Sequence, residues 1–422
     1  MKRGFYTIMT AQFFSSLADN ALFVAAVELL RPHDPTGWQR AALVPMFALF
    51  YVILAPFVGA FADAHAKGRV MFVSNAIKAV GCLMMLWGGH PLTAYAIVGL
   101  GAAAYSPAKY GILTELLPPS QLVKANGWIE GLTITSIILG VVLGGWLIGP
   151  QVSPWLLRLS PPGIHTGAQA AIACLILVYL LAAWFNTRIP QTGVALRPMP
   201  RNWLLLLPDF YDCNRTLWRD RLGQISLATT TLFWGVSGNL RYIVLAWAAA
   251  ALGYSTSQAS SLVGVVAIGT AAGAIAASLH MHLDRATRVM PLGILMGLLV
   301  VLMNWIDHFW VATPFLIALG AIGGFLVVPM NALLQHRGHM LMGAGRSIAV
   351  QNFNEQAAIL ALGMGYSAAT GWGVSAFAAI TGFGLLVAAA MAAIQVWHRH
   401  NERHHGDELQ RLLALARDEQ TH

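Results

Sequence analysis

The stretch that decides the fold is residues 7–30, which read TIMTAQFFSSLADNALFVAAVELL. It is long and apolar enough to cross a bilayer, which takes about 20 such residues. Its only ionisable group before Glu28 is Asp19, which stands in the middle beside Asn20. A carboxylate at membrane depth costs about 3 kcal/mol or more unless it faces a partner or a watery cavity. We therefore predict a spanning helix whose Asp19 belongs to a polar site formed with another helix.

Composition places the whole chain in a membrane. Of its 422 residues, 57% are hydrophobic and only 10% are charged, whereas soluble domains carry about 25% charged residues. The net charge of +8 would suggest nucleic acid in a soluble protein, but here it reflects basic cytoplasmic loops, and we expect no nucleic-acid partner. The scattered Cys82, Cys174 and Cys213 form neither a disulfide framework nor a metal pattern. We expect no metal and no cofactor.

Apolar runs predict twelve spanning helices separated by short, turn-rich segments. They lie near residues 7–30, 41–62, 70–89, 92–113, 123–148, 167–188, 223–250, 257–279, 288–306, 311–334, 346–370 and 372–397. Basic residues gather on one side of this arrangement, and the other side has only Arg31, Arg40 and Arg158. The asymmetry predicts a multi-pass protein with both termini in the cytoplasm.

The two halves of the chain repeat each other. Three pairs of motifs return in span order at nearly constant spacing: Phe14…Asn20 and Phe233…Asn239, Arg69-Val-Met and Arg288-Val-Met, and Asn126-Gly-Trp-Ile-Glu130 and Gln351-Asn-Phe-Asn-Glu355. Parallel repeats of six spans are typical of major facilitator transporters. We therefore predict an all-α membrane protein with twelve transmembrane helices in two six-helix pseudo-symmetric bundles. The expected parts are an N-terminal bundle (1–188), a cytoplasmic linker (189–222), a C-terminal bundle (223–397) and a cytoplasmic tail (398–422).

Ionisable residues inside the spans are candidate functional groups. They are Asp19, Lys78, Glu130, Arg241 and Glu355, with Lys109 near a span end. The repeat places Arg241 at the depth of Asp19, on helices that face each other in this fold class, so we expect the two to form a central substrate site. The guanidinium of Arg241 suits a phosphate, because its planar fork donates two hydrogen bonds at once. The alternative is an ion pair that only fastens the two bundles.

A second candidate set lies on the fifth and eleventh spans. Glu130 and Glu355 are repeat mates, and Asn126 lies one helical turn before Glu130. Asn354 joins the second carboxylate. Such a set can accept hydrogen bonds from an ammonium headgroup, and interhelical hydrogen bonding alone is the equally good alternative.

The turn between the second and third spans carries a candidate latch. Gly59, Asp63, Lys67 and Arg69 follow one another there in the pattern Gly59-x3-Asp63-x3-Lys67-Gly68-Arg69. This turn resembles the signature loop of major facilitator proteins, in which an Asp and basic residues hold the two halves together. The resemblance implies a gating role for these four residues.

The most distinctive stretch is AAAYSPAKYGILTE at residues 102–115, with LVKANG at 122–127 and FVGAFAD at 57–63. Together with FWG at 233–235 and VPMNALLQ at 328–335, these motifs closely resemble the lysophospholipid transporters of bacterial inner membranes. The likeness runs over roughly residues 5–397.

That resemblance implies a flippase, not an enzyme. Such proteins move lysophosphatidylethanolamine and lysophosphatidylglycerol from the outer to the inner leaflet of the bacterial inner membrane by alternating access. A separate acyltransferase/acyl-carrier-protein synthetase then restores the missing acyl chain. Arg241 and Lys109 would meet the phosphate, and Asp19 or Glu130 would meet the ethanolamine. The implied partners are the lysophospholipid, membrane lipids and that enzyme, and the transporter itself is expected to be a monomer.

Two other functions are compatible with parts of the sequence. A proton-coupled exporter of amphipathic drugs or other small molecules would use Asp19 as its proton carrier. A membrane-embedded lipid enzyme is disfavoured, because the chain shows no nucleophile–base or metal-ligand constellation. Small residues such as Gly140, Gly144, Gly269 and Gly273 either line a path for the acyl chain or serve close helix packing.

Overall fold

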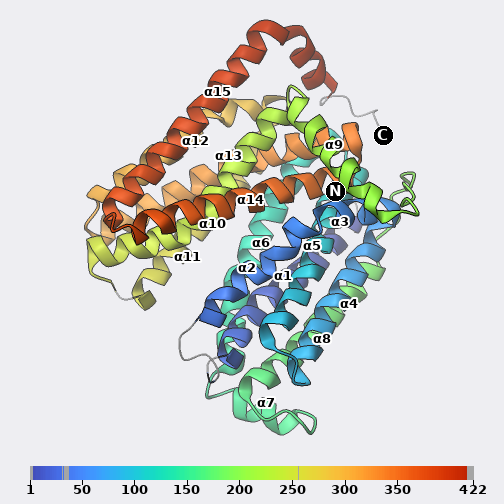
Figure 1. The fold of residues 1–422 in the computed structure, drawn as a ribbon, viewed down its shortest axis with the longest axis vertical. Helices are drawn as coiled ribbons and strands as arrows, with labels where there is room; N and C mark the ends of the chain where they lie inside the picture. Colours follow the sequence, from blue (N-terminus) through green and yellow to red (C-terminus); the bar gives the residue numbers. More distant parts are fainter. Residues whose placement is uncertain (1–2, 31, 33–37, 255, 416–422) are drawn as a thin grey trace. The chain divides into compact units, whose positions relative to one another are not determined.

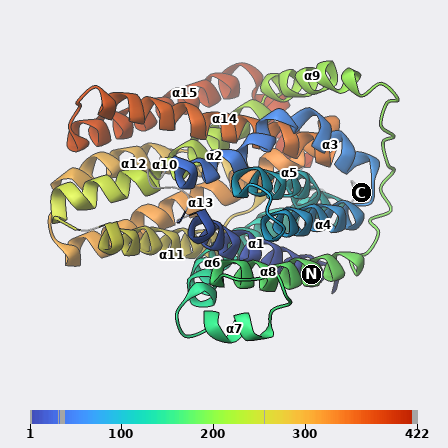
Figure 2. The same cartoon turned by 60° about the horizontal axis from the view of Figure 1, so that its bottom comes forward.

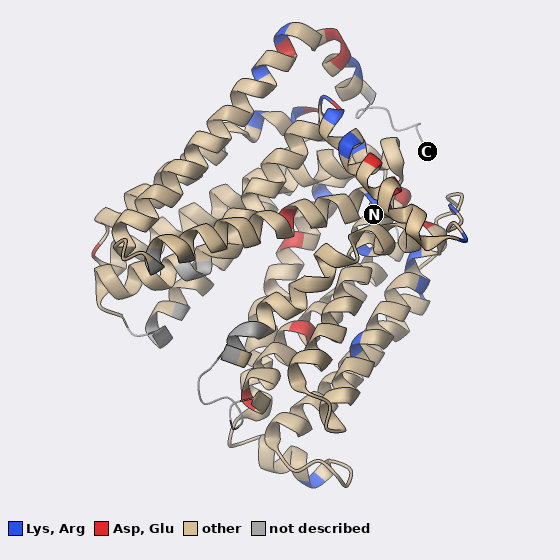
Figure 3. Cartoon of the chain, in the orientation of Figure 1, with Lys and Arg blue, Asp and Glu red and all other residues tan. Residues whose placement is uncertain are grey.

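The computed structural model describes residues 3–30, 32, 38–254 and 256–415, and in these residues all regular structure is helical (Figure 1). Each of the twelve expected spans coincides with a helical segment. Eight helices in the described ranges are long and apolar enough to cross a membrane, or nine if the bent pair α2 and α3 is one span. Figure 3 shows Lys, Arg, Asp and Glu rare along the long helices and concentrated on α9 and the last turns of α15.

The described chain divides into two compact units. Unit 1 comprises residues 1–116, 135–211 and 342–350, and unit 2 comprises residues 117–134, 212–341 and 351–422. By these bounds α6 (Pro119–Ile148) and α14 (Ala344–Gly371) each begin in one unit and end in the other. Helices of 30 and 28 residues are long enough to pack against different neighbours at their two ends.

Unit 1 is a bundle in which α4 packs against both α5 and α8, and α8 also packs against α1 (Figure 2). Its helices are α1 (Arg3–Leu30), α2 (Trp38–Ile53), α3 (Ala55–Ala64), α4 (Lys67–Leu86), α5 (Pro91–Leu116), the short α7 (Ser153–Leu159), α8 (Gly167–Thr187) and, from its start, α9 (Leu206–Arg219). The α2–α3 pair bends by 63°, directly before Pro56, whose ring cannot continue the preceding backbone ladder. Apolar side chains of α1, α4, α5 and α8 form its core.

Unit 2 holds the remaining long helices, with α15 packed against α12 and α10. They are α10 (Gly223–Leu252), α11 (Thr256–His280), η3 (Leu283–Val289), α12 (Pro291–Leu302), η4 (Met303–Trp305), α13 (Phe309–Met342) and α15 (Ala376–Leu415). Close helix contact explains several glycines here. A Cβ on Gly269 or Gly273 would run into the backbone of α13 at Ile317 or Ala321, so these two glycines serve packing.

Two helical segments lie where the sequence predicts a linker and a tail. Helix α9 runs through the expected linker, and its exposed side includes Trp203 and Leu204 just before it and Leu207 and Tyr211 within it. The expected tail is helical as far as Leu415, because α15 continues past the end of its span with a kink at His405.

Candidate functional site

Asp19 is bound by two side chains from neighbouring helices of unit 1. Its Oδ2 lies 2.7 Å from Nζ of Lys78 on α4, and the hydroxyl of Tyr179 on α8 donates a hydrogen bond of 2.7 Å to its Oδ1. The Lys78 side chain is 2% exposed, whereas that of Asp19 is 19% exposed. The carboxylate therefore has an open side and the ammonium does not.

The ammonium of Lys78 is enclosed by further polar and aromatic groups. It donates a 3.0 Å hydrogen bond to Oγ of Ser15, and Ser15 in turn donates to Oδ1 of Asn75 at 2.7 Å. The ring centroid of Tyr105 lies 5.1 Å from Nζ, within the range of a cation–π interaction. We call Ser15, Asp19, Asn75, Lys78, Tyr105 and Tyr179 the Asp19 cluster.

Two buried groups of the Asp19 cluster have spare hydrogen-bonding capacity. Among the described residues, neither the hydroxyl of Tyr105 nor Nδ2 of Asn75 has a hydrogen-bond partner. Buried polar atoms are nearly always paired with protein or water. The hydroxyl of Tyr105 and Nδ2 of Asn75 can therefore donate hydrogen bonds to a ligand, and the hydroxyl can also accept one.

The structure gives Asp19 a partner that the sequence interpretation did not assign. The expected partner was Arg241, whose side chain lies outside the described part of the chain, so that pairing stays a prediction. Lys78 is visible in the sequence as an intramembrane cation. Its pairing with Asp19 depends on how α1 and α4 are rotated about their axes, which hydropathy does not encode.

The face of α1 around Asn20 packs closely against two glycines of α6. The amide of Asn20 donates to the carbonyl of Ser16 at 2.8 Å, within the same helix. A Cβ on Gly140 would lie 2.7 Å from the carbonyl oxygen of Leu17, and one on Gly144 would lie 2.8 Å from that of Ala21. Gly140 and Gly144 thus serve close packing against α1.

The second expected set is an amide network in unit 2. Asn126 on α6 and Gln335 on α13 exchange two hydrogen bonds of 2.9 Å, and both residues are buried. Gln351 on α14 donates to Oδ1 of Asn331 at 2.9 Å and to Glu355 at 2.7 Å. Glu130 is buried as well. The sequence interpretation missed Gln335 and Asn331, although both lie in the 328–335 motif.

Asn354 and Lys109 make separate contacts. The amide of Asn354 donates to Asn214 at 3.0 Å and accepts from the indole of Trp218 at 3.2 Å, so it is bound to α9. Its expected place in the set with Glu355 stays a prediction. Lys109 on α5 is buried, with Nζ 4.0 Å from the ring centroid of Tyr110.

Asp63 binds the start of α14 within unit 1. Its carboxylate accepts the backbone N–H of Gly345 at 2.6 Å and that of Arg346 at 3.0 Å. The guanidinium of Arg346 adds a contact of 3.3 Å. A carboxylate at a helix N-terminus pairs with free N–H groups and with the positive end of the helix dipole.

Of the other expected latch residues, Gly59 and Lys67 take part in contacts here and Arg69 does not. A Cβ on Gly59 would lie 2.7 Å from Cβ of Ala349 and 3.0 Å from Cα of Arg346, so only glycine lets α3 come this close to α14. Lys67 lies 3.3 Å from Asp63 and 3.1 Å from Glu115. Arg69 is exposed and takes no part in these contacts.

Two further carboxylates, which the sequence interpretation missed, support the contact between α3 and α14. Glu115 holds Lys67, and Asp209 on α9 lies 2.8 Å from Nε of Arg346. Asp63 is thereby surrounded by cations that are themselves paired. We call Gly59, Asp63, Lys67, Glu115, Asp209, Gly345 and Arg346 the α3–α14 contact.

Comparison with known proteins identifies the family. The sequence matches the Major Facilitator Superfamily over residues 8–359. Lysophospholipid transporter LplT of Salmonella arizonae is 41% identical over 400 residues, which are 94% of this chain and 96% of that protein. Lysophospholipid transporter LplT of Klebsiella pneumoniae is 40% identical over 398 residues, with the same coverage. The chain belongs to the lysophospholipid transporter family.

Solved structures agree with this family on the fold. The human organic anion transporter MFSD10 (TETRAN) has a TM-score of 0.70 at 16% identity, covering 94% of this chain and all of that one. FucP, a major facilitator transporter solved in the outward conformation, has a TM-score of 0.70 at 15% identity, covering 94% of this chain and 98% of that one. The expected twelve-helix major facilitator fold is confirmed, and so is a multi-pass membrane protein.

Membership in the lysophospholipid transporter family also indicates whether the protein is an enzyme. The curated relatives are named transporters, so the expectation that the chain is not an enzyme is confirmed.

Proposed function

We propose that this protein is a lysophospholipid flippase of the bacterial inner membrane. It would move lysophosphatidylethanolamine and lysophosphatidylglycerol from the outer to the inner leaflet, where a separate acyltransferase/acyl-carrier-protein synthetase reacylates them. The observation that carries the proposal is the identity of about two residues in five, over 94% of the chain, to proteins named lysophospholipid transporters. Both termini would lie in the cytoplasm.

The Asp19 cluster supplies chemistry for the headgroup. A carboxylate accepts hydrogen bonds from an ethanolamine ammonium and equally from glycerol hydroxyls, so the open side of Asp19 suits both headgroups. The buried ammonium of Lys78 contacts Oδ2 of that carboxylate and holds it in place. The hydroxyl of Tyr105 and Nδ2 of Asn75, which have no partner among the described residues, offer further hydrogen bonds. The phosphate remains assigned to Arg241 and Lys109, as the sequence suggests.

The remaining expected residues have supporting roles in this proposal. Asn126 and Glu355 belong to the buried amide contacts of unit 2, which would hold that part of the substrate path in shape, and the buried Glu130 would lie beside that path. Gly59, Asp63 and Lys67 would act as the gate, since the amides of Gly345 and Arg346 are released whenever α14 moves away from α3.

Reconstituted protein tests the function directly. Fluorescent lysophosphatidylethanolamine is added outside proteoliposomes, and the fraction that albumin can extract is followed with time. A time-dependent protected fraction that exceeds that of protein-free liposomes, with the lipid chemically unchanged, supports transport. An altered lipid would indicate an enzyme, and transport of cationic drugs without lysolipid would indicate the exporter.

The variant Asp19→Asn tests the headgroup site. It keeps the size of the side chain and removes its charge, so we expect a fall in the transport rate of about tenfold or more. Asp307→Asn is the matched control, because Asp307 is exposed in a connecting segment of unit 2. Equal rates for Asp19→Asn and Asp307→Asn would remove Asp19 from the site while leaving the transport proposal in place.

A further inference from the structure

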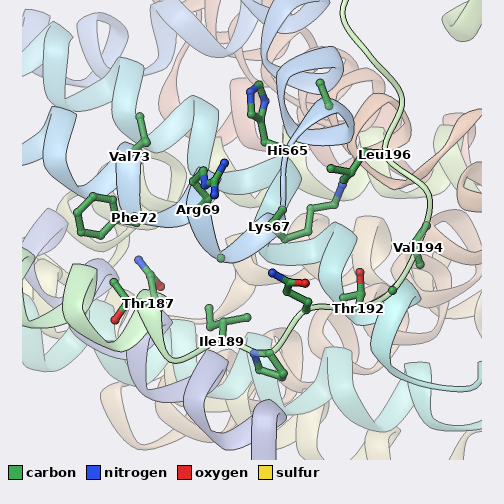
Figure 4. Close-up of a pocket in the computed structure, with 17 residues that line it drawn as sticks. His65, Lys67, Arg69, Phe72, Val73, Thr187, Ile189, Thr192, Val194 and Leu196 are labelled. Atoms are coloured by element: carbon green, nitrogen blue, oxygen red, sulfur yellow. The ribbon is translucent and has the colours of Figure 1, made fainter.

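A cavity of about 720 Å³ lies in unit 1 where α4 begins. Figure 4 shows its labelled side chains coming from the α3–α4 turn, the first turns of α4, the end of α8 and the segment 189–196. Among the described residues that line it, none is Asp or Glu, whereas His65, Lys67 and Arg69 are basic. The charge of the wall favours an anion.

The backbone N–H groups at the start of α4 also favour an anion. The first N–H groups of a helix have no partner within the helix and carry the positive end of its dipole. Here the residue before the helix, Ala66, has no side chain that can cap them. The N–H groups of Arg69 and Val70 bind the carbonyl of Ala66, so the amides that a ligand can use are those of Lys67 and Gly68, two residues that line the cavity.

Asn186, near the end of α8, provides the independent sign of a ligand. It lines the cavity and is 1% exposed. Within the described part of the chain, neither its side-chain oxygen nor its nitrogen has a hydrogen-bond partner. Buried polar atoms are nearly always paired with protein or water, so this side chain is the group that a polar ligand in the cavity would satisfy.

Arg69 is the cation available to such a group. Lys67 is already held by Asp63 and Glu115. For Arg69 the described residues show neither an ion pair nor a side-chain hydrogen bond, and the side chain is exposed. Its planar guanidinium can bind two oxygens of one tetrahedral anion.

We propose that this cavity binds a phosphate group, held by the guanidinium of Arg69, the first amides of α4 and the side-chain amide of Asn186. The apolar side chains of Phe72 and Val73 on the same wall suit the glycerol ester of a phospholipid headgroup, and a soluble phosphate shares the recognised chemistry. The site lies about 14 Å along α4 from Lys78, given 1.5 Å per residue. It is thus distinct from the Asp19 cluster and does not depend on the proposed function.

Equilibrium binding to the purified full chain in detergent tests the proposal. The probe is fluorescent phosphatidylglycerol, and the competitors are inorganic phosphate and diacylglycerol, a lipid without phosphate. We expect Arg69→Gln and Asn186→Leu each to weaken probe binding by about tenfold. Arg158→Gln, which changes an exposed arginine on α7, should bind like the wild type. Because Arg69 is exposed, we expect Arg69→Gln to fold. The test can therefore be carried out even if Asn186→Leu does not fold.

The competitors separate the two sources of the phosphate. Competition by inorganic phosphate supports a site for the free anion, and its absence, with binding still dependent on Arg69, supports a lipid headgroup. Competition by diacylglycerol as strong as that of unlabelled phosphatidylglycerol overturns the proposal. So does wild-type affinity in Arg69→Gln, or equal loss of binding in Arg158→Gln.

Discussion

Nζ of Lys78 lies 2.7 Å from Oδ2 of Asp19, and the lysine is the more deeply buried partner, with a side chain 2% exposed against 19% for the aspartate. The carboxylate therefore keeps an open side, which the ammonium lacks. The unequal burial has a consequence for stability, since the partner that is left unpaired decides how much a substitution destabilises the fold.

We predict that Asp19→Leu destabilises the protein more than Lys78→Met. The first variant leaves a fully buried ammonium without its anion, at about 3–5 kcal/mol, whereas the second leaves a carboxylate with an open side. Thermal unfolding in detergent measures both. The double variant Asp19→Leu/Lys78→Met should recover part of the loss, and strictly additive effects would show that the two groups are not coupled.

Tyr179→Phe should lower both stability and transport. The substitution removes the hydrogen bond from the phenol to Asp19 Oδ1, and hydrogen bonds to charged groups contribute about 1.5–3 kcal/mol. Tyr211→Phe is the matched control, because Tyr211 is 64% exposed on α9. The same unfolding temperature and transport rate in both variants would contradict an orienting role for Tyr179.

Gly59→Ala should disrupt the α3–α14 contact. The new Cβ would lie 2.7 Å from Cβ of Ala349 and 3.0 Å from backbone atoms of Gly345 and Arg346, and overpacking of this kind costs about 1–3 kcal/mol. Transport assays and unfolding curves measure the effect. At Gly145 of α6 a Cβ would meet nothing within 4 Å, so Gly145→Ala should behave like the wild type.

Two carboxylates that contact Arg346 should differ in importance. Asp63 is 5% exposed and accepts two backbone N–H groups, whereas Asp209 is 44% exposed and contacts the guanidinium of Arg346. Asp63→Asn should therefore impair transport much more than Asp209→Asn, because exposed ion pairs contribute only about 0–1 kcal/mol. The reverse order in proteoliposome transport rates would rule out Asp63 as the main contact of α14.

Each expected span coincides with a helix because a hydrophobic run of sufficient length is a local property of the chain. The same local logic missed α7, since a short helix leaves no hydropathy signal. Gly59, Asp63 and Lys67 could be singled out because they follow one another in a turn with a known pattern. Their contacts Gly345 and Arg346, far along the chain, could not.

The sequence by itself determined the membrane class, the order of the spans, the internal repeat and the family, because all of these are written in composition, hydropathy and motif spacing. Only the tertiary structure decided that Asp19 pairs with Lys78 and Tyr179, that Asp63 binds the first amides of α14, and that Asn354 turns toward α9. The physical reason is the same in each case. Which face of a helix meets which neighbour depends on the packing of whole helices, and a rotation by one residue moves a side chain about 100° around the axis.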